Sequence, residues 1–406
     1  MLSSVADSRE TRFDPAATPE IRRGERAPRT IHLAVIGASG RVGSRALELI
    51  AAQGEVWRAA GVNPHVVAVA NSRQALVALE GIDAARAAER LLAAAPGPHA
   101  ADQFADALLR LPVRPLIVLD CSASADVAAR YPAWLAAGID IVTPNKLGPS
   151  ADKVLAGAIG AAQAASGARL FDATTVGAQL PLLSTLRELR RAGDRIERFE
   201  AVLSGTLSYV LGRVQQGEAL STAVRGAVAE GYAEPHPARD LSGEDAARKL
   251  VILLRALGHE VELADIECVP LVDAQLLAEP DPAQLLQRLG AADETWRARA
   301  ALAQARRERW VYRASFDSAG FTRTCARVAP ERVPFDHPLA NLAPSENKLV
   351  LHSAFYRAAP LTVSGPGAGI DLTAAGVLGD LLSAAQRYAT QPGVTLDSAQ
   401  RIEAAA

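Results

Sequence analysis

The stretch Ile31-His-Leu-Ala-Val-Ile36 runs directly into Gly37-Ala-Ser-Gly40-Arg-Val-Gly43. Its first half is a continuous apolar run, which is typical of a parallel strand buried on both faces. The second half leads into an amphipathic helix that we expect to reach about Ala52. Glycines at such a junction let the backbone approach a pyrophosphate, whose charge the helix N-terminus stabilises. The alternative is a tight strand–helix turn without a ligand. We predict a dinucleotide-binding turn formed by Gly37, Ala38, Ser39, Gly40, Arg41, Val42 and Gly43.

Three further strands are expected at Val66–Ala70, Pro115–Asp120 and Gly138–Val142, with helical stretches between them that include Asp83–Ala95 and Ala125–Ala137. Alternating strands and helices imply a parallel sheet with right-handed crossovers. The fold class predicted for this part is therefore α/β, a Rossmann-type nucleotide-binding domain over residues 29–172.

After Phe171 the regular alternation of predicted strands and helices ends. We expect a helix over Pro181–Ala192, a strand over Arg198–Leu203, helices from Leu207 to about Leu257, and three antiparallel strands. These strands are predicted at Trp310–Phe316, Thr322–Val328 and Leu349–Phe355, with a turn around Asp317–Gly320. The pattern predicts an α+β catalytic and dimerisation domain over residues 173–363. A glycine-rich loop and a C-terminal helix, residues 364–406, follow, and residues 1–28 read as a mobile tail.

The end of the second strand usually selects the dinucleotide. An acidic residue there favours NAD, because it binds the ribose 2′-hydroxyl. This chain has Asn71-Ser-Arg73 instead, and an arginine with small polar groups suits a 2′-phosphate. We therefore expect NADP, with NAD as the alternative.

Two polar segments follow the next strands. Asp120-Cys-Ser122-Ala-Ser124 ends the third and Thr143-Pro-Asn145-Lys146 the fourth. Ligands in open α/β sheets bind beyond the carboxyl ends of the strands, so both segments are expected to face the cofactor cleft.

Lysine is rare in this chain. Of 43 basic residues only Lys146, Lys153, Lys249 and Lys348 are lysines. Arginine stays protonated in proteins, whereas a lysine can give up a proton. Asp245 and Lys249 are spaced i, i+4 on one helix face, and the apolar run that follows predicts a buried helix, capped by Asp240 or Ser242. A lysine can protonate a developing alkoxide, and nearby carboxylates bind an ammonium, so the pattern indicates reduction of an amino-acid aldehyde.

Composition limits the class. The chain has 406 residues, a formal net charge of −2 and 49% hydrophobic residues, which is typical of a soluble enzyme that binds neither nucleic acid nor membrane. Its three cysteines lack metal-type spacing. We expect a cytoplasmic protein that acts on a small molecule.

The ordered motifs resemble those of homoserine dehydrogenase, over about residues 31–390. They include Thr175-Val-Gly-Ala178, Ser204-Gly-Thr-Leu-Ser-Tyr209, Gly231-Tyr-Ala-Glu234-Pro and Gly365-Pro-Gly-Ala-Gly369. The chain is most similar to the dehydrogenase part of fused aspartokinase–homoserine dehydrogenases, and no kinase part is expected in it. The resemblance implies a homodimer that interconverts aspartate 4-semialdehyde and homoserine with NAD(P)H, in threonine, methionine and isoleucine biosynthesis.

The resemblance also implies roles for individual residues. Lys249 would donate the proton, Lys146 would lie near nicotinamide and substrate, and Glu234, Asp240 and Asp245 would bind the amino acid. Cofactor contacts would come from the Gly37–Val42 turn, Ser122, Lys146, Gly231, Gly367 and Gly369. A sodium-type monovalent cation would be held by backbone carbonyls of Val176, Ala178 and Leu180.

Some positions depart from the family pattern. The glycine turn is one residue longer, and Gln179 stands where the family has glycine. Ala173 occupies the position of an acidic cation ligand, and His236, Ala238 and Arg239 replace family residues beside Asp240. A reductase of another amino aldehyde and a non-catalytic NADPH-binding sensor therefore stay as alternatives.

Overall fold

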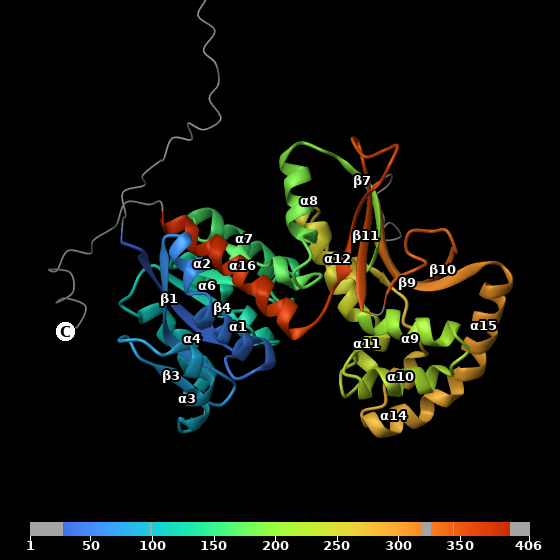
Figure 1. Ribbon diagram of the computed structural model, residues 1–406, viewed down its shortest axis with the longest axis horizontal. Coiled ribbons are helices and arrows are strands. Elements are labelled where there is room, and N and C mark those ends of the chain that lie inside the picture. Colours follow the sequence, from blue (N-terminus) through green and yellow to red (C-terminus); the bar gives the residue numbers. More distant parts are fainter. Residues whose placement is uncertain (1–26, 98–99, 319–325, 344, 390–406) are drawn as a thin grey trace, which may run out of the picture.

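A computed structural model describes residues 27–97, 100–318, 326–343 and 345–389. It has two six-stranded sheets, each with helices packed against it (Figure 1). The predicted tail falls almost entirely outside the described residues.

The first sheet has the strand order β3-β2-β1-β4-β5-β6 and is parallel except for the β2–β3 pair. Its strands are β1 (Arg29–Ile36), β2 (Val62–Ala70), β3 (Ala75–Val77), β4 (Leu116–Asp120), β5 (Asp140–Val142) and β6 (Leu170–Phe171). The four strands predicted for this part are confirmed, and every residue of β4 is buried, as a strand covered on both faces requires.

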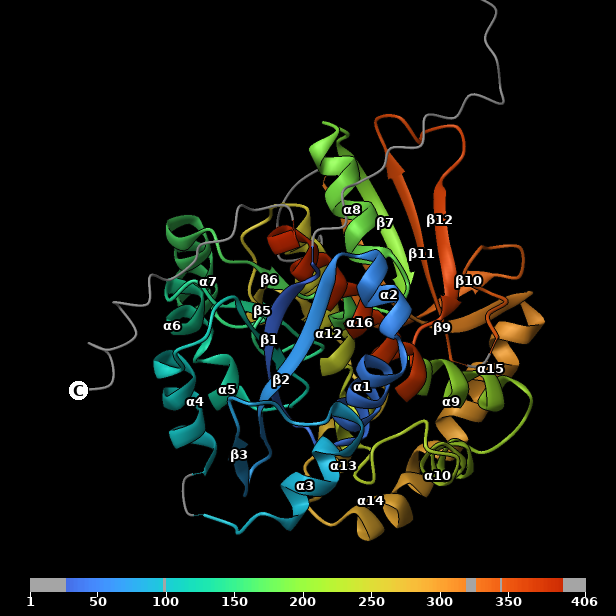
Figure 2. The same ribbon diagram turned by 60° about the vertical axis from the view of Figure 1, so that its left-hand side comes forward.

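Helices cover both faces of this sheet (Figure 2). One apolar layer joins it to α1 (Arg41–Ala52), α2 (Gly54–Ala59), α3 (Ala87–Ala93) and α16 (Ile370–Ala389). The opposite layer joins it to α4 (Ala100–Arg110), α5 (Ala125–Ala128), α6 (Tyr131–Ala136) and α7 (Lys153–Ser166). The doubly covered parallel sheet confirms the predicted α/β class.

The second sheet has the order β12-β11-β7-β9-β10-β8 and is antiparallel except for the short β8–β10 pair. Its strands are β7 (Ile196–Val202), β8 (Glu267–Cys268), β9 (Glu308–Asp317), β10 (Ala326–Pro334), β11 (Glu346–Ser353) and β12 (Leu361–Pro366). The predicted antiparallel sheet is confirmed. Residues 319–325, which include part of the predicted turn and of one predicted strand, lie outside the described residues.

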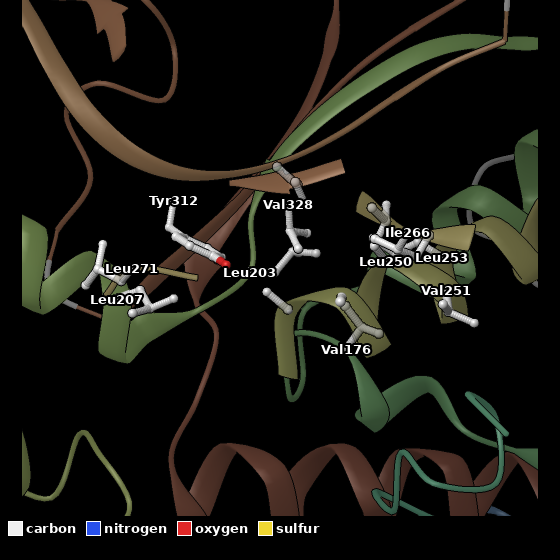
Figure 3. Close-up of a cluster of buried hydrophobic side chains, with 14 of the residues drawn as sticks. Val176, Leu203, Leu207, Leu250, Val251, Leu253, Ile266, Leu271, Tyr312 and Val328 are labelled. Carbon is white, nitrogen blue, oxygen red and sulfur yellow. The ribbon is translucent and has the colours of Figure 1, made fainter. Parts of the chain in front are cut away.

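One face of this sheet packs on helices, and their shared core includes Leu203, Leu250 and Tyr312 (Figure 3). The helices are α8 (Leu182–Arg191), α9 (Gly205–Gln215), α10 (Leu220–Ala229), α11 (Ala238–Ser242), α12 (Glu244–Ala256), α13 (Ala274–Leu277), α14 (Pro282–Arg288) and α15 (Asp293–Ala305). This part also contains three short 3₁₀ turns in the described residues: η2 (Ala173–Thr175), η3 (Leu263–Asp265) and η4 (Leu289–Ala292).

The last described helix, α16, leaves the second sheet and packs against α1 of the first (Figure 1). Arg45 pairs with Asp371 at 2.7 Å near one end, and Arg387 pairs with the buried Asp140 at 2.7 Å near the other. No helix in the described ranges is long and apolar enough to cross a membrane.

Several elements were not anticipated. β3, β6 and β8 have only two or three residues, too few to show a period. β12 was expected to be part of a glycine-rich loop, and this was wrong for residues 364–366, which pair with β11 as an edge strand. The bounds predicted for the domains stay predictions.

Asp380 of α16 offers a test of how this helix is docked. Burial, and the neighbouring charge of Asp172, raise the pKa of Asp380 to about 6, against hydrogen bonds from Thr174 and Ala173. A pKa raised by folding stabilises the native state at pH values below the ordinary carboxyl pKa, and this stability is lost as the pH rises through about 6.

We predict that Asp380→Asn raises the free energy of unfolding by about 1–2 kcal/mol at neutral pH and has little effect near pH 4. Urea unfolding at both pH values would measure this, with Asp126→Asn, at an exposed position of α5, as the control. An equal effect at both pH values would contradict the assignment.

Candidate active site

The glycine turn between β1 and α1 is built by close backbone contacts. Gly37 has φ +74°, and a Cβ there would lie 2.8 Å from the carbonyl of Cys121. A Cβ on Gly43 would lie 2.1 Å from the Gly37 oxygen. Gly40 caps α1 without a side-chain hydrogen bond. The turn therefore leaves the helix N-terminus open to an anionic group, and its residues fit a dinucleotide pyrophosphate.

The turn after β2 lies beside it. The Asn71 amide donates to Ser39 Oγ at 3.0 Å, and its carbonyl oxygen accepts the backbone N–H groups of Arg73 and Gln74, each at 2.8 Å. Arg73 itself is exposed. Asn71 thus joins two of the predicted cofactor segments and orients the backbone that carries Arg73.

The Asp120 and Thr143 segments meet at the carboxyl ends of β4 and β5, as predicted. The Asp120 carboxylate is fully buried and accepts hydrogen bonds from Tyr131 at 2.6 Å, Asn145 at 3.1 Å and the backbone N–H of Ser122 at 2.8 Å. Thr143 Oγ1 donates to the Asp120 carbonyl at 2.8 Å. These residues hold one another, so they fix the two segments that carry Ser122 and Lys146.

Both lysines singled out in the sequence converge on one carboxylate. Lys146 Nζ lies 3.1 Å from Asp245 Oδ1, and Lys249 Nζ lies 2.8 Å from Asp245 Oδ2. Lys146 follows β5 of the first sheet, whereas Asp245 and Lys249 lie on α12 under the second. The cluster therefore joins the two halves of the molecule.

Burial and charge separate the members of the cluster. The Lys249 side chain is 13% exposed, but that of Asp245 is 41% exposed. Both residues are thus partly buried, Lys249 more than Asp245, which lies in the first turn of the helix, ahead of its apolar run. Desolvation opposes ionisation of Asp245, yet the ammonium groups of Lys249 and Lys146 outweigh it and hold its pKa well below the usual range.

Lys249 is also anchored to the sheet. Its Nζ donates to the carbonyl of Leu203, directly after β7, at 2.7 Å. An ammonium has three N–H donors. Within the described ranges two of them are engaged, by Leu203 and by Asp245. The third can face a substrate oxygen.

Asp240 lies beside this cluster. It accepts hydrogen bonds from Thr206 Oγ1 and from the backbone N–H of Glu234, both at 3.0 Å. Burial raises the pKa of Asp240 against these two bonds, with smaller contributions from the charges of Asp245 and Glu234. Glu234 is exposed. Three carboxylates therefore lie close enough to interact, a setting that suits a ligand ammonium.

The predicted cap of the lysine helix was wrong in part. Asp240 bonds to Thr206 and Glu234 instead, because Gly243 ends α11 and starts α12 with φ +77°. Ser242 does accept the N–H of Glu244 at 3.2 Å. A Cβ on Gly243 would lie 1.7 Å from the Tyr312 hydroxyl, so glycine is required at this break.

Sequence reasoning missed the residue that ties the Lys146 segment to α12. Arg255 donates to the carbonyls of Pro149 at 2.8 Å, Ala151 at 2.6 Å and Val261 at 2.8 Å. Arg248 reaches Ser150 Oγ at 3.3 Å. Arginine is the common cation of this chain, so nothing in its sequence setting distinguishes Arg255.

Three residues beside Asp240, namely His236, Ala238 and Arg239, differ from the family pattern. His236 Nε2 is 3.1 Å from the Glu279 carbonyl and 3.2 Å from that of Pro280, next to α14. Arg239 is exposed. These substitutions leave the contacts among Lys146, Asp245 and Lys249 intact.

The predicted cation carbonyls lie in the loop between η2 and α8. Ala178 has φ +54°, which is unusual for a residue with a side chain. Asp172, the nearest upstream acid, pairs with Arg187 at 2.6 Å. In the described part of the chain no group of three or more acidic, histidine or cysteine side chains could hold a metal. The cation at Val176, Ala178 and Leu180 stays a prediction.

The remaining residues predicted to contact the cofactor lie in two turns. Gly231 has φ +78° and follows α10. Gly367 and Gly369 form the connection from β12 to α16, where the Gly367 N–H donates to the Ser345 carbonyl at 3.1 Å. This connection passes from the second sheet to α16, which packs against α1, the helix that begins at the glycine turn.

Both halves of the chain match models of known protein families. Residues 39–172 match the family model "Homoserine dehydrogenase, NAD binding domain", and residues 181–382 match "Homoserine dehydrogenase". A homoserine dehydrogenase of Emericella nidulans is 37% identical over 296 residues, which cover 70% of this chain and 79% of that protein.

A maize bifunctional aspartokinase/homoserine dehydrogenase is 36% identical over 87% of this chain and 38% of its own length. Another maize bifunctional protein is 39% identical, with 29% of its own length matched. The chain thus spans about a third of the length of these two relatives.

The fold is also similar to those of solved structures. A Candida auris protein of unknown function superposes with a TM-score of 0.77 at 31% identity, over 88% of this chain and 99% of that one. A putative homoserine dehydrogenase of Archaeoglobus fulgidus gives 0.68 at 25%, over 87% and 98%. The chain, with its open glycine turn and its two lysines on one carboxylate, belongs to the homoserine dehydrogenase family of oxidoreductases.

Proposed function

We propose that this protein reduces L-aspartate 4-semialdehyde to L-homoserine, and catalyses the reverse reaction, with NADPH as its preferred dinucleotide. The observation that carries the proposal is the convergence of Lys146 and Lys249 on Asp245. A bound nicotinamide would supply the hydride. The protein's own residues must then place the aldehyde and deliver a proton to its oxygen.

Lys249 is the proton donor in this proposal. Two of its donor positions are used by Leu203 and Asp245, which aim the ammonium, and the third remains for the substrate oxygen. After giving up that proton, the neutral amine keeps both anchoring hydrogen bonds. Lys146 adds a second positive charge that stabilises the developing alkoxide.

The acidic residues would bind the amino group of the substrate. Glu234 and Asp245 are exposed enough to reach a ligand, and Asp240 holds the Glu234 backbone through its hydrogen bond. The raised pKa of Asp240 adds a pH-sensitive element beside them. An amino acid with a reducible side chain fits this distribution of charge.

Preference for NADPH rests on Arg73 and Ser39. Arg73 is exposed, and Asn71 fixes its backbone and contacts Ser39. These residues would hold a 2′-phosphate, which an acidic residue at this position would repel. A hyperthermophilic archaeal homoserine dehydrogenase with the same fold was solved in complex with NADPH.

The proposal extends to the setting of the reaction. Homoserine formed here would enter threonine, methionine and isoleucine biosynthesis in the cytoplasm, and the protein would act as a homodimer formed through its second domain. Light scattering after size-exclusion chromatography would give the number of copies.

Oxidation of NADPH, and separately of NADH, by the purified protein with aspartate 4-semialdehyde tests the reaction. Rapid turnover with a higher kcat/KM for NADPH is the expected result. NADPH binding without turnover, on this substrate and its longer or shorter analogues, would reject the proposed reaction.

We predict that Lys249→Arg lowers kcat by at least about 100-fold and leaves the dissociation constant for NADPH nearly unchanged, because arginine keeps the charge but does not release a proton. Steady-state kinetics and nicotinamide fluorescence would measure the two quantities. Lys153→Arg, on an exposed helix start, is the matched control. Near-normal turnover of the Lys249→Arg variant would remove Lys249 from its assigned role.

Arg73→Ser should raise the KM for NADPH about tenfold and change the KM for NADH little. Only NADPH has a 2′-phosphate, so only NADPH would lose a charge-assisted hydrogen bond from Arg73. The matched control is Arg110→Ser, another exposed arginine, at the end of α4. Equal changes for the two dinucleotides would contradict the assignment of Arg73.

A further inference from the structure

Asn347 on β11 is buried, and its side-chain amide stands apart from the other buried polar groups. The residue is 1% exposed, and among the described residues neither its Oδ1 nor its Nδ2 has a hydrogen-bond partner. Buried amides are nearly always hydrogen-bonded, because an unsatisfied one destabilises the folded state. A leucine of similar size would avoid this penalty. The amide therefore does not stabilise the ligand-free fold, and its presence needs another explanation.

The position of Asn347 connects two parts of the active site. It lies one residue beyond the Lys348–Val202 pair of the sheet, and Leu203, whose carbonyl accepts the Lys249 ammonium, is one residue beyond that pair on β7. It also lies on the same face of β11 as Leu349 and Leu351, which belong to the helix-covered core. Asn347 therefore faces the side of the sheet on which α12 carries the lysines.

The amide lies directly under the β12–α16 connection. A Cβ on Gly367 would lie 2.0 Å from Asn347 Cγ and 2.2 Å from its Nδ2, so the amide fills the space that a side chain would need. Within this connection Gly369 has φ +128°, a backbone conformation that glycine adopts readily. Beyond it, Asp371 pairs with Arg45 of α1, the helix that starts at the dinucleotide turn.

We propose that Asn347 is a positioning residue that holds the Gly367–Gly369 loop on bound dinucleotide. Its carboxamide offers two donors and an acceptor to the loop peptide groups, and the glycines let those groups turn toward it when the dinucleotide contacts the loop. Asn347 acts through the loop, because at 1% exposure it has no surface for direct contact with a ligand. The inference rests on dinucleotide binding at the proposed site and is independent of which aldehyde is reduced.

The Asn347→Leu variant separates this role from a structural one. Without dinucleotide it should melt at the same temperature as the unmodified protein or higher, because an unsatisfied amide is replaced by an apolar group of similar size. Its dissociation constant for NADPH, measured by nicotinamide fluorescence, should rise about tenfold, and the melting-temperature gain on adding NADPH should shrink accordingly. The matched control is Val350→Ile, on the opposite face of the same strand, which should change neither quantity.

A second pair of variants tests the same contact from the side of the loop. Gly367→Ala should destabilise the protein through the 2.0 Å contact, and Asn347→Ala combined with it should restore stability but not NADPH affinity. NADPH affinity equal to that of the unmodified protein in Asn347→Leu or in the double variant would overturn the proposal. So would a loss of dinucleotide-free stability in Asn347→Leu, since the amide would then already be satisfied. If the unmodified protein bound NADPH but did not turn over the semialdehyde, the proposed reaction would fail while this binding test kept its meaning.

Discussion

One carboxylate, that of Asp245, organises the active site. It binds Lys146, which the first sheet supplies, and Lys249, which lies on the same helix one turn further along. A carboxylate that serves two ammonium groups stays ionised, and burial alone would have favoured its neutral form. The distance between the two halves of the molecule is thereby fixed where the chemistry is proposed to occur, and Arg255 reinforces it through the backbone of residues 149–151.

Polar side chains that are hydrogen-bonded to one another and to the backbone do much of the positioning. Asp120, Tyr131 and Asn145 satisfy one another in a fully buried network, and this network sets where Lys146 leaves the sheet. Asn71 does the same for the turn that carries Arg73. Such networks stabilise only when complete. Asn347 departs from that pattern, which is why it stands out among the buried polar residues.

The sequence predicted much of this, for identifiable reasons. The apolar run at Ile31–Ile36 predicted a buried parallel strand and the glycines after it a tight turn into a helix. The scarcity of lysine drew attention to Lys146 and Lys249. Their meeting on one carboxylate could not be predicted from spacing, because Lys146 and Asp245 are 99 positions apart in the sequence. Arg255 and Asn347 were missed because their roles depend on backbone atoms of distant segments. The partial exposure of the Asp245 side chain was not predicted, because the apolar residues of α12 begin only after it.

The central claim is that Asp245 orients both lysines for the reaction. The most direct measurement is the kcat of Asp245→Asn at saturating NADPH and aspartate 4-semialdehyde, with the dissociation constant for NADPH measured alongside. The account predicts a fall in kcat of about 100-fold, because the neutral amide aims the proton-donating ammonium poorly, with nearly unchanged NADPH binding. An unchanged kcat would show that the lysines are positioned without this carboxylate, and would contradict the account.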